Sequence, residues 1–215
     1  MKKLRAILSI LVTMGTLTTA QAADFALGVK GGTLGLGAEL TTSIVSNLNV
    51  RLGLNSYSYD YTTTESGIDY DAELDLGTTA LLLDWHPFSG RFRISAGIMK
   101  NDNGINMSAT PTTNQIIGGT SYTPAQIGTL TGKIGFKDTA PYVGIGFGNA
   151  VSKNKRIGFT LDIGVLIQDS PEVTLSASGG AVSLVDLGAE EAQLESDISE
   201  FDVYPVISLG VSYRF

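Results

Sequence analysis

The sequence predicts an all-β fold, a transmembrane antiparallel up-and-down β-barrel of eight strands. Three observations predict this fold. The final residues alternate between apolar and polar side chains and stop at the aromatic Phe215, as the closing strand of an outer-membrane barrel does. The chain starts like a secretory leader, and its apolar strand-length stretches are joined alternately by short and long connections.

Residues 1–23 are predicted to be a signal peptide, which leaves 24–215 as one barrel domain. The leader has a basic start with Lys2, Lys3 and Arg5, an apolar run over 6–14 and small residues around 20–23. The apolar run is shorter than the ~20 residues that a membrane-spanning helix needs. The flanking residues disfavour the alternative of an N-terminal core helix.

The first three expected strands follow one another through short turns. Residues 25–30 and 33–44 flank Gly31-Gly32, a pair that favours a two-residue hairpin. The third strand begins at Leu48, and the side chains expected on the outer surface of the second and third strands are Leu34, Leu36, Ala38, Leu40, Leu48, Val50, Leu52 and Leu54. Beyond them Tyr57, Tyr59 and Tyr61 have the opposite parity. Either a bulge shifts the register there, or the stretch already stands above the bilayer.

The fourth and fifth strands are expected over 68–85 and 92–98, on either side of a turn at 86–90. The upper part of the fourth strand is acidic, whereas Leu81, Leu83 and Trp85 in its lower part face outward. A long connection rich in Thr, Asn and Gly is then expected over 101–130.

The last three strands are expected over 131–148, 157–168 and 203–215. Glycines alternate with apolar residues in the sixth strand, and the seventh has an unbroken outer row from Ile157 to Ile167. Between the seventh and eighth strands, residues 170–200 form a long excursion whose acidic piece, 190–200, could form one or two turns of helix.

The connection lengths orient the predicted barrel in the bacterial outer membrane. The connections after the second, fourth and sixth strands are short, and those after the third, fifth and seventh are long. Short turns face the periplasm in bacterial barrels, so both termini are expected there. The expected partners are outer-membrane lipid, lipopolysaccharide and, through the strand that ends in Phe215, the barrel-assembly machinery.

Composition narrows the possible functions. The whole chain has 14 basic and 21 acidic residues; without Lys2, Lys3 and Arg5 the balance is 11 against 21, a net charge near −10. Nucleic acid is therefore not expected as a partner, because binding it requires neutralising phosphates with Lys and Arg. The absence of cysteine excludes disulfides and thiolate chemistry. A secreted soluble sandwich is the competing fold, but its apolar rows would have to face a core.

Strand parity places a small set of charged side chains in the barrel interior. The predicted lumen charge network consists of Lys30, Glu39, Arg51, Asp84, Arg93, Asp162 and Arg214. An eight-stranded barrel is just wide enough for side chains to fill, so a packed network is one interpretation and a narrow polar path for small solutes is the other. Because unpaired buried charge is costly, Glu39 and Asp162 should each contact a base.

The sequence predicts no enzymatic activity and no cofactor or metal. Lipid-modifying barrels need a His beside a Ser and an acid, since a hydroxyl requires a neighbouring general base. The one histidine, His86, falls in a predicted periplasmic turn and is expected to be an interface residue. No phosphate-binding loop, zinc spacing or calcium loop is present.

Two acidic clusters are expected in external loops. Their members are Asp71, Glu73 and Asp75 in one, and Glu190, Glu191 and Glu195 in the other. Solvated surface is the plain interpretation. Around a pore mouth the clusters would concentrate cations, and divalent ions that bridge them to anionic lipid are a third possibility.

Residues 137–147, Lys-Asp-Thr-Ala-Pro-Tyr-Val-Gly-Ile-Gly-Phe, resemble the carbapenem-associated outer-membrane protein family, also called ornithine-uptake porins. The resemblance continues through a Lys-Asn turn and an apolar strand to the Ser-Pro-Glu-Val-Thr-Leu of 170–175. It implies an eight-stranded barrel that takes up small basic amino acids, with carbapenem passage as a side effect. The chain departs from the family in its shorter loops and in ending on Phe215 where a Trp is expected.

Two function classes follow from the sequence. The first is a narrow porin-like channel for small solutes, including basic amino acids. The alternative is a structural or surface-interacting barrel whose lumen is plugged by side chains.

Overall fold

The computed structural model of the chain describes residues 24–215 except 66, 67 and 154. The predicted signal peptide therefore lies outside the described residues. In the described part, no helix is long and apolar enough to cross a membrane.

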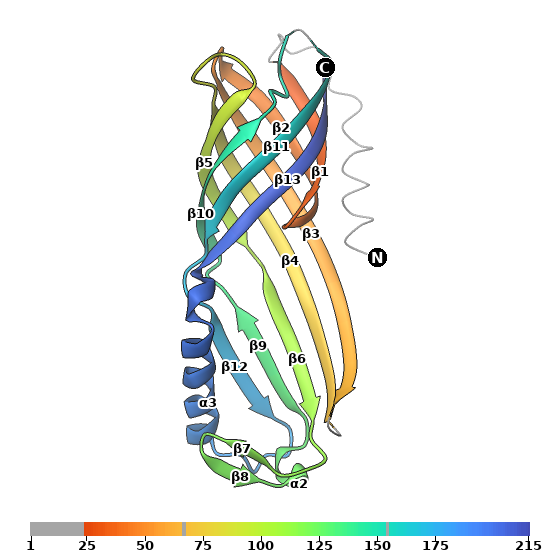
Figure 1. The fold of residues 1–215 in the computed structure, drawn as a ribbon, viewed down its shortest axis with the longest axis vertical. Helices are drawn as coiled ribbons and strands as arrows, with labels where there is room; N and C mark the ends of the chain where they lie inside the picture. Colours follow the sequence, from red (N-terminus) through yellow and green to blue (C-terminus); the bar gives the residue numbers. More distant parts are fainter. Residues whose placement is uncertain (1–23, 66–67, 154) are drawn as a thin grey trace.

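Eight antiparallel strands close into a barrel, as predicted (Figure 1). In order around the ring they are β1 (Phe25–Gly32), β2 (Gly35–Val45), β3 (Leu48–Glu65), β4 (Ile68–Trp85), β5 (Phe92–Asn101), β10 (Thr139–Phe147), β11 (Ile157–Ile167) and β13 (Val203–Arg214). The first and last strands pair, and Phe25 stacks on Phe215 with ring centroids 5.0 Å apart. The closed ring leaves no unpaired strand edge in the barrel wall, as lipid requires.

The sheet continues beyond one rim of the barrel, at the end opposite the C-terminus (Figure 1). There β3 and β4 extend past the β1–β2 hairpin and are joined by β6 (Gly104–Thr110), β9 (Leu130–Gly135) and β12 (Glu172–Ala177) in the order β3-β4-β6-β9-β12. We call these five strands beyond the rim the extension sheet. Its far end carries β7 (Gln115–Ile117), β8 (Thr120–Tyr122) and the short helix α2 (Pro124–Ile127).

Helix α3 (Leu184–Asp197) lies along β12, and a 3₁₀ turn, η1 (Ser199–Asp202), leads from it into β13. The Ser183 hydroxyl caps the helix by accepting a hydrogen bond from the Val185 amide at 3.1 Å. Of the acidic piece, residues 190–197 thus lie in the second part of a 14-residue helix, and residues 199 and 200 belong to η1.

Side-chain parity in the barrel wall follows the prediction with one exception. The outward rows of β3, β4, β10, β11 and β13 are exposed and apolar, and the inward rows are buried. Leu34, expected on the outer surface, is instead 4% exposed and packs against Leu82 and Met99 inside the barrel. It lies in the hairpin turn before β2 begins at Gly35, so strand parity does not apply to it.

Two further expectations needed correction. Residues 131–148 are not one strand: β9 belongs to the extension sheet and β10 to the barrel, with a break between Gly135 and Thr139. The long connection over 101–130 is largely structured, because it contains β6, β7, β8 and α2. The β3–β4 register runs without a shift from Leu48 opposite Trp85 to the end of β3, so of the two alternatives for Tyr57, Tyr59 and Tyr61 the structure excludes the bulge.

Because the register is continuous, the two faces of the sheet exchange polarity at the rim of the barrel: the face that is apolar on one side of the rim is polar on the other. The row of β3 that faces the lumen at Arg51 and Asn55 continues as Tyr57, Tyr59 and Tyr61. Cross-strand neighbours on that face are apolar, while the opposite face carries the acidic residues of β4. Within the barrel the apolar face is the outer one, and in the extension sheet it is the inner one.

Candidate functional site: the charged layer in the barrel

Six of the seven predicted interior charges meet in one layer across the lumen. They come from six strands of the ring, one each from β1, β2, β3, β4, β5 and β11, and are Lys30, Glu39, Arg51, Asp84, Arg93 and Asp162. We call this group the charged layer. All six side chains are at most 9% exposed, since the alternation of each strand turns them inward.

Arg51 is the hub of the charged layer. Its Nη2 donates to Asp84 Oδ1 at 2.9 Å, and its Nη1 donates to Asp162 Oδ2 at 3.0 Å. The same Nη1 lies 3.4 Å from Glu39 Oε2. One guanidinium therefore ties together three carboxylates from three strands, a geometry that its planar fork of donors permits.

The other two cations complete the pairing. Arg93 Nη2 donates to Asp162 Oδ1 at 2.7 Å, and Lys30 Nζ lies 3.2 Å from Glu39 Oε2. The layer thus holds three cations and three anions, and the expectation that Glu39 and Asp162 would each contact a base is confirmed.

Two uncharged groups in the layer are not among the predicted site residues. The Ser95 hydroxyl donates to Asp84 Oδ1 at 2.6 Å, and Arg93 Nη1 donates to the Gly148 carbonyl at 2.6 Å. Ser95 has the inward parity of its strand, so the alternation could have found it. The Gly148 carbonyl follows β10 at a positive φ of 122°, which no side-chain pattern indicates.

Arg214 is the predicted member that does not join the layer. Its Nη1 donates to Asp24 Oδ1 at 2.8 Å, and its Nη2 donates to the Lys153 carbonyl at 3.2 Å. The side chain lies at the end of the barrel with both described termini and the short turns. It therefore fastens the last strand to the residue before the first.

The lumen is filled on both sides of the charged layer. Toward the extension lies an apolar layer of Leu34, Ala80, Leu82, Met99, Ala140, Tyr142, Leu166 and Val206. Toward the termini, Asn49 Nδ2 lies 3.2 Å from His86 Nε2. Two small spaces, each with room for about one water molecule, flank Arg51, which lines both.

His86 is buried at 1% exposure and is not the interface residue that the sequence predicted. Its Nδ1 donates to the Gly90 carbonyl at 3.1 Å, and its Nε2 accepts from Asn49. Burial lowers the pKa of this imidazole, which lies in the turn after β4. A neutral ring that donates one hydrogen bond and accepts another suits a structural role in the turn.

The predicted acidic clusters are not in loops. Asp71, Glu73 and Asp75 belong to β4, on the outer face of the extension sheet. The second cluster lies on α3, where Glu191 accepts from the Leu175 amide at 2.6 Å and Glu195 from the Val173 amide at 2.9 Å. Glu190 accepts from the Gly118 amide at 3.1 Å.

Neither cluster points toward the barrel axis, so the structure does not place a ring of acids around a pore mouth. Among the residues that the structure describes, no group of three His, Asp or Glu side chains could hold a metal ion.

Two solved structures from Acinetobacter baumannii share this fold. CarO2 superposes with a TM-score of 0.59 at 22% identity, covering 91% of this chain and 100% of that one. CarO gives a TM-score of 0.59 at 21% identity, covering 92% of this chain and 100% of its own. The resemblance inferred from residues 137–147 and 170–175 is therefore confirmed at the level of the fold.

A major outer-membrane protein from Thermus thermophilus is similar as well, with a TM-score of 0.52 at 15% identity, covering 91% of this chain and all of that one. No protein-family model matches the sequence. No curated protein sequence matches it either. The chain is thus an outer-membrane-type β-barrel, and its function has to be argued from its own residues.

Proposed function

We propose that this chain is an outer-membrane barrel with a closed lumen, which anchors the extension sheet and presents it outside the membrane. The observation that carries this proposal is the charged layer. Three cations and three carboxylates pair across the full width of the lumen, and opening a path would separate buried charges at a cost of several kcal/mol.

The proposal includes an orientation. Both described termini lie with the short turns, and bacterial barrels place short turns in the periplasm. The extension sheet would then face the cell exterior, in contact with lipopolysaccharide at its base. The strand that ends in Phe215 would be the one that the barrel-assembly machinery recognises.

A narrow channel for small solutes is the second candidate. Two small spaces lie on opposite sides of the charged layer, and Arg51 separates them. If Arg51 swung aside, the two spaces would join in a polar path. Basic amino acids, which the resemblance implies as solutes, would then have to pass three carboxylates.

Conductance in planar bilayers tests the two candidates. We expect the purified wild-type barrel to give no current above the lipid background. The Arg51→Ala variant removes the hub side chain and should give current if it still folds. Steady cation-selective current through the wild-type barrel would overturn the closed-lumen proposal and support the channel.

The matched control is Arg91→Ala. Arg91 is an exposed residue of the turn between β4 and β5, outside the lumen. Its guanidinium carbon lies 6.0 Å from the centroid of the Phe147 ring. We expect this variant to behave as wild type, so that current seen with Arg51→Ala can be assigned to the charged layer.

A further inference from the structure

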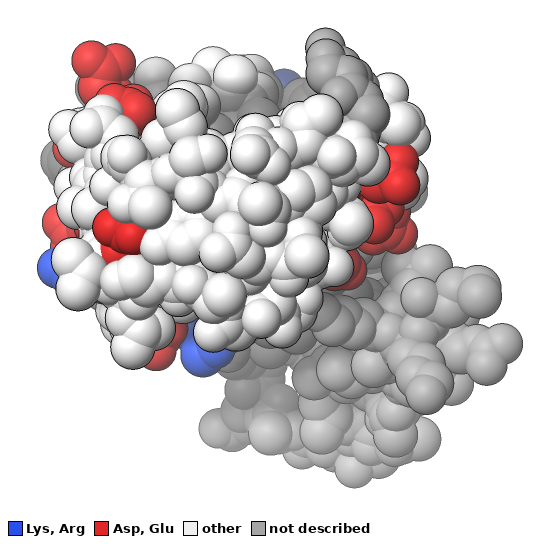
Figure 2. Space-filling view, turned by 90° about the horizontal axis from the view of Figure 1, so that it is seen from below, with Lys and Arg blue, Asp and Glu red and all other residues white. Residues whose placement is uncertain are grey.

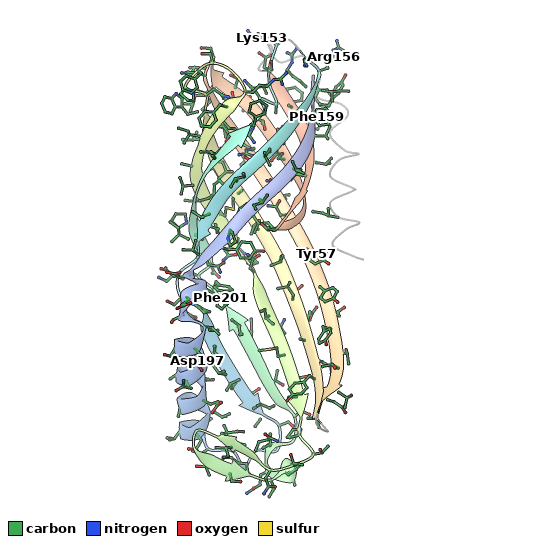
Figure 3. All side chains as sticks on the ribbon, in the orientation of Figure 1. Tyr57, Lys153, Arg156, Phe159, Asp197 and Phe201 are labelled. Atoms are coloured by element: carbon green, nitrogen blue, oxygen red, sulfur yellow. The ribbon has the colours of Figure 1, made fainter. Side chains whose placement is uncertain are left out.

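Beyond the barrel rim, β3 keeps its pairing with β4 but loses its pairing with β2 on the other side. β2 pairs with β3 only from Leu48 to Ser56. Among the described residues, no strand pairs with Ser58–Thr64 on that side. We call Ser58–Thr64 the free edge; it begins just past Tyr57, at the point where β3 leaves the barrel wall (Figure 3). The outward N–H and C=O groups of an edge strand are ready to pair with another chain.

The opposite edge of the extension sheet is closed. There the outer amides of β12 donate to carboxylates of α3, at 2.6 Å from Leu175 to Glu191 and 2.9 Å from Val173 to Glu195. Helices and charges are usual means of blocking a sheet edge. The chain therefore blocks one edge of this sheet and leaves the other open.

The inner face beside the free edge is aromatic. Tyr57, Tyr59 and Tyr61 are each about half exposed, and Met107 on the same face is 40% exposed. Farther across the sheet this face is covered, because Leu130 and Leu175 pack against the end cap formed by β7, β8 and α2. Tyrosine offers a large contact area at a small loss of side-chain entropy, so this uncovered strip suits the apolar side chains of a partner.

The outer face beside the free edge is acidic. Asp60 pairs with Glu73 across the strands, and Asp71 and Asp75 follow on the same face of β4. The sequence has no Lys or Arg between Arg51 and Arg91, so neither strand supplies a counter-charge there. Seen from the extension end, acidic side chains stand at the periphery of the molecule (Figure 2).

We propose that the free edge binds an extended polypeptide whose side chains alternate between apolar and basic, as an added strand of the sheet. Alternate side chains of an added strand lie on opposite faces. The apolar ones would rest beside Tyr59 and Tyr61, and the basic ones beside Asp60. Opposite charges on neighbouring strands attract, which selects this peptide over an acidic one.

A second copy of the chain fits this edge poorly. The β3 strand of each copy continues into its own barrel wall, so parallel pairing of two free edges would bring the barrels into collision at β2. Antiparallel pairing would put the barrels at opposite ends of the joined sheet, which two chains in one membrane cannot do. A polypeptide segment has no such constraint. This inference rests on one part of the proposed function, namely that the extension sheet lies outside the membrane.

The natural absence of cysteine allows a direct test by disulfide trapping on the full chain. The probe is a synthetic peptide of alternating Lys and Val, long enough to span the free edge, with one Lys replaced by an activated Cys. Ser58→Cys and Thr62→Cys place a thiol on the acidic face of the free edge. Thr174→Cys is the control, since Thr174 is exposed on the same face of the blocked edge.

We expect trapping at Ser58→Cys and Thr62→Cys, and at least tenfold less at Thr174→Cys. A peptide with the same residues arranged in a Lys block and a Val block should also react at least tenfold less. Equal trapping at both edges, equal reaction of the block peptide, or no trapping would overturn the proposal.

Affinity measurements test the selectivity. Asp60→Asn should weaken binding of the alternating peptide about threefold, the size of one cross-strand charge pair. Glu73→Gln should weaken it less, because Glu73 lies on β4, one strand farther from the peptide. Unchanged binding in both variants would contradict the choice of a basic partner. A bilayer conductance result leaves these outcomes unaffected, so the two proposals can fail separately.

Discussion

Replacing Arg51 with Met should destabilise the barrel more than any surface substitution. The change removes the donor that contacts Asp84, Asp162 and Glu39 at 2.9–3.4 Å. Lys30 and Arg93 would then face three buried carboxylates, which leaves one negative charge without a partner. Removing one member of a buried ion pair costs about 3–5 kcal/mol. Because a typical domain is stable by only about 5–15 kcal/mol, the loss would be a large share of the total.

The assay is urea unfolding in detergent micelles or lipid vesicles. The fluorescence of the single tryptophan, Trp85, reports unfolding. Its side chain is 48% exposed on the outer surface of the barrel, so it contacts detergent or lipid in the folded chain and water in the unfolded one. The surface control is Lys137→Met, which breaks the pair with Asp169, a pair whose side chains are 62% and 56% exposed. Exposed pairs contribute about 0–1 kcal/mol, so this control should unfold almost as wild type does.

A double variant separates charge imbalance from lost packing. Arg51→Met combined with Asp162→Asn leaves Lys30 and Arg93 against Glu39 and Asp84, which restores balance. We expect the double variant to be less destabilised than the sum of the single variants. A single Arg51→Met effect below about 1 kcal/mol, or strict additivity in the double variant, would refute the argument from buried charge.

Other substitutions test separate parts of the fold. Gly146→Ala would put a Cβ 2.8 Å from an arginine nitrogen of the charged layer, and should cost about 1–3 kcal/mol in urea unfolding. Glu191→Ala removes the acceptor of the Leu175 amide, so hydrogen exchange of that amide should speed up on the order of tenfold, with distant amides unchanged. The Asp186 carboxylate, which accepts from the Tyr122 hydroxyl at 2.5 Å, raises the pKa of that phenol. Since the pKa is higher in the folded chain than in the unfolded one, this stabilisation is full below pH of about 10 and is lost as pH rises further, and Tyr122→Phe should remove that part of the pH dependence.

The barrel could be predicted from the sequence because the pattern that indicates it, the alternation of apolar and polar side chains, lies within each strand. Alternation alone assigns each residue of β11 and β13 to the outer or inner surface, and the closed ring then brings inward charges together. The same rule found Asp162 and its partners. It misplaced Leu34 because a turn residue has no parity, and Arg214 because parity gives the face of a strand but not the depth along the barrel.

The extension could not be predicted in the same way. Strands β6 and β9 fold by pairing with β4 and β12, partners that are distant in the sequence and leave no pattern within the segment. The parity of Tyr57 differs from that of the leucines before it. Whether that parity puts its side chain in the lumen or on the inner face of the extension sheet depends on where the barrel wall ends. That point is set by the short β1–β2 hairpin and not by β3 itself. The sequence also does not show that carboxylates of α3 accept hydrogen bonds, because that role depends on the edge of β12.

The most direct test of the whole account is a scan of single spin labels along β3, from Val50 to Thr62, in lipid vesicles. The measurement compares the accessibility of each label to oxygen dissolved in lipid and to a water-soluble nickel complex. We predict that labels at Leu52 and Leu54 contact lipid, whereas labels at Ser58, Asp60 and Thr62, on the same face, contact water. Lipid contact that continues unchanged through Thr62, or water contact at Leu52, would contradict a barrel that carries its sheet beyond the membrane with the two faces exchanged in character.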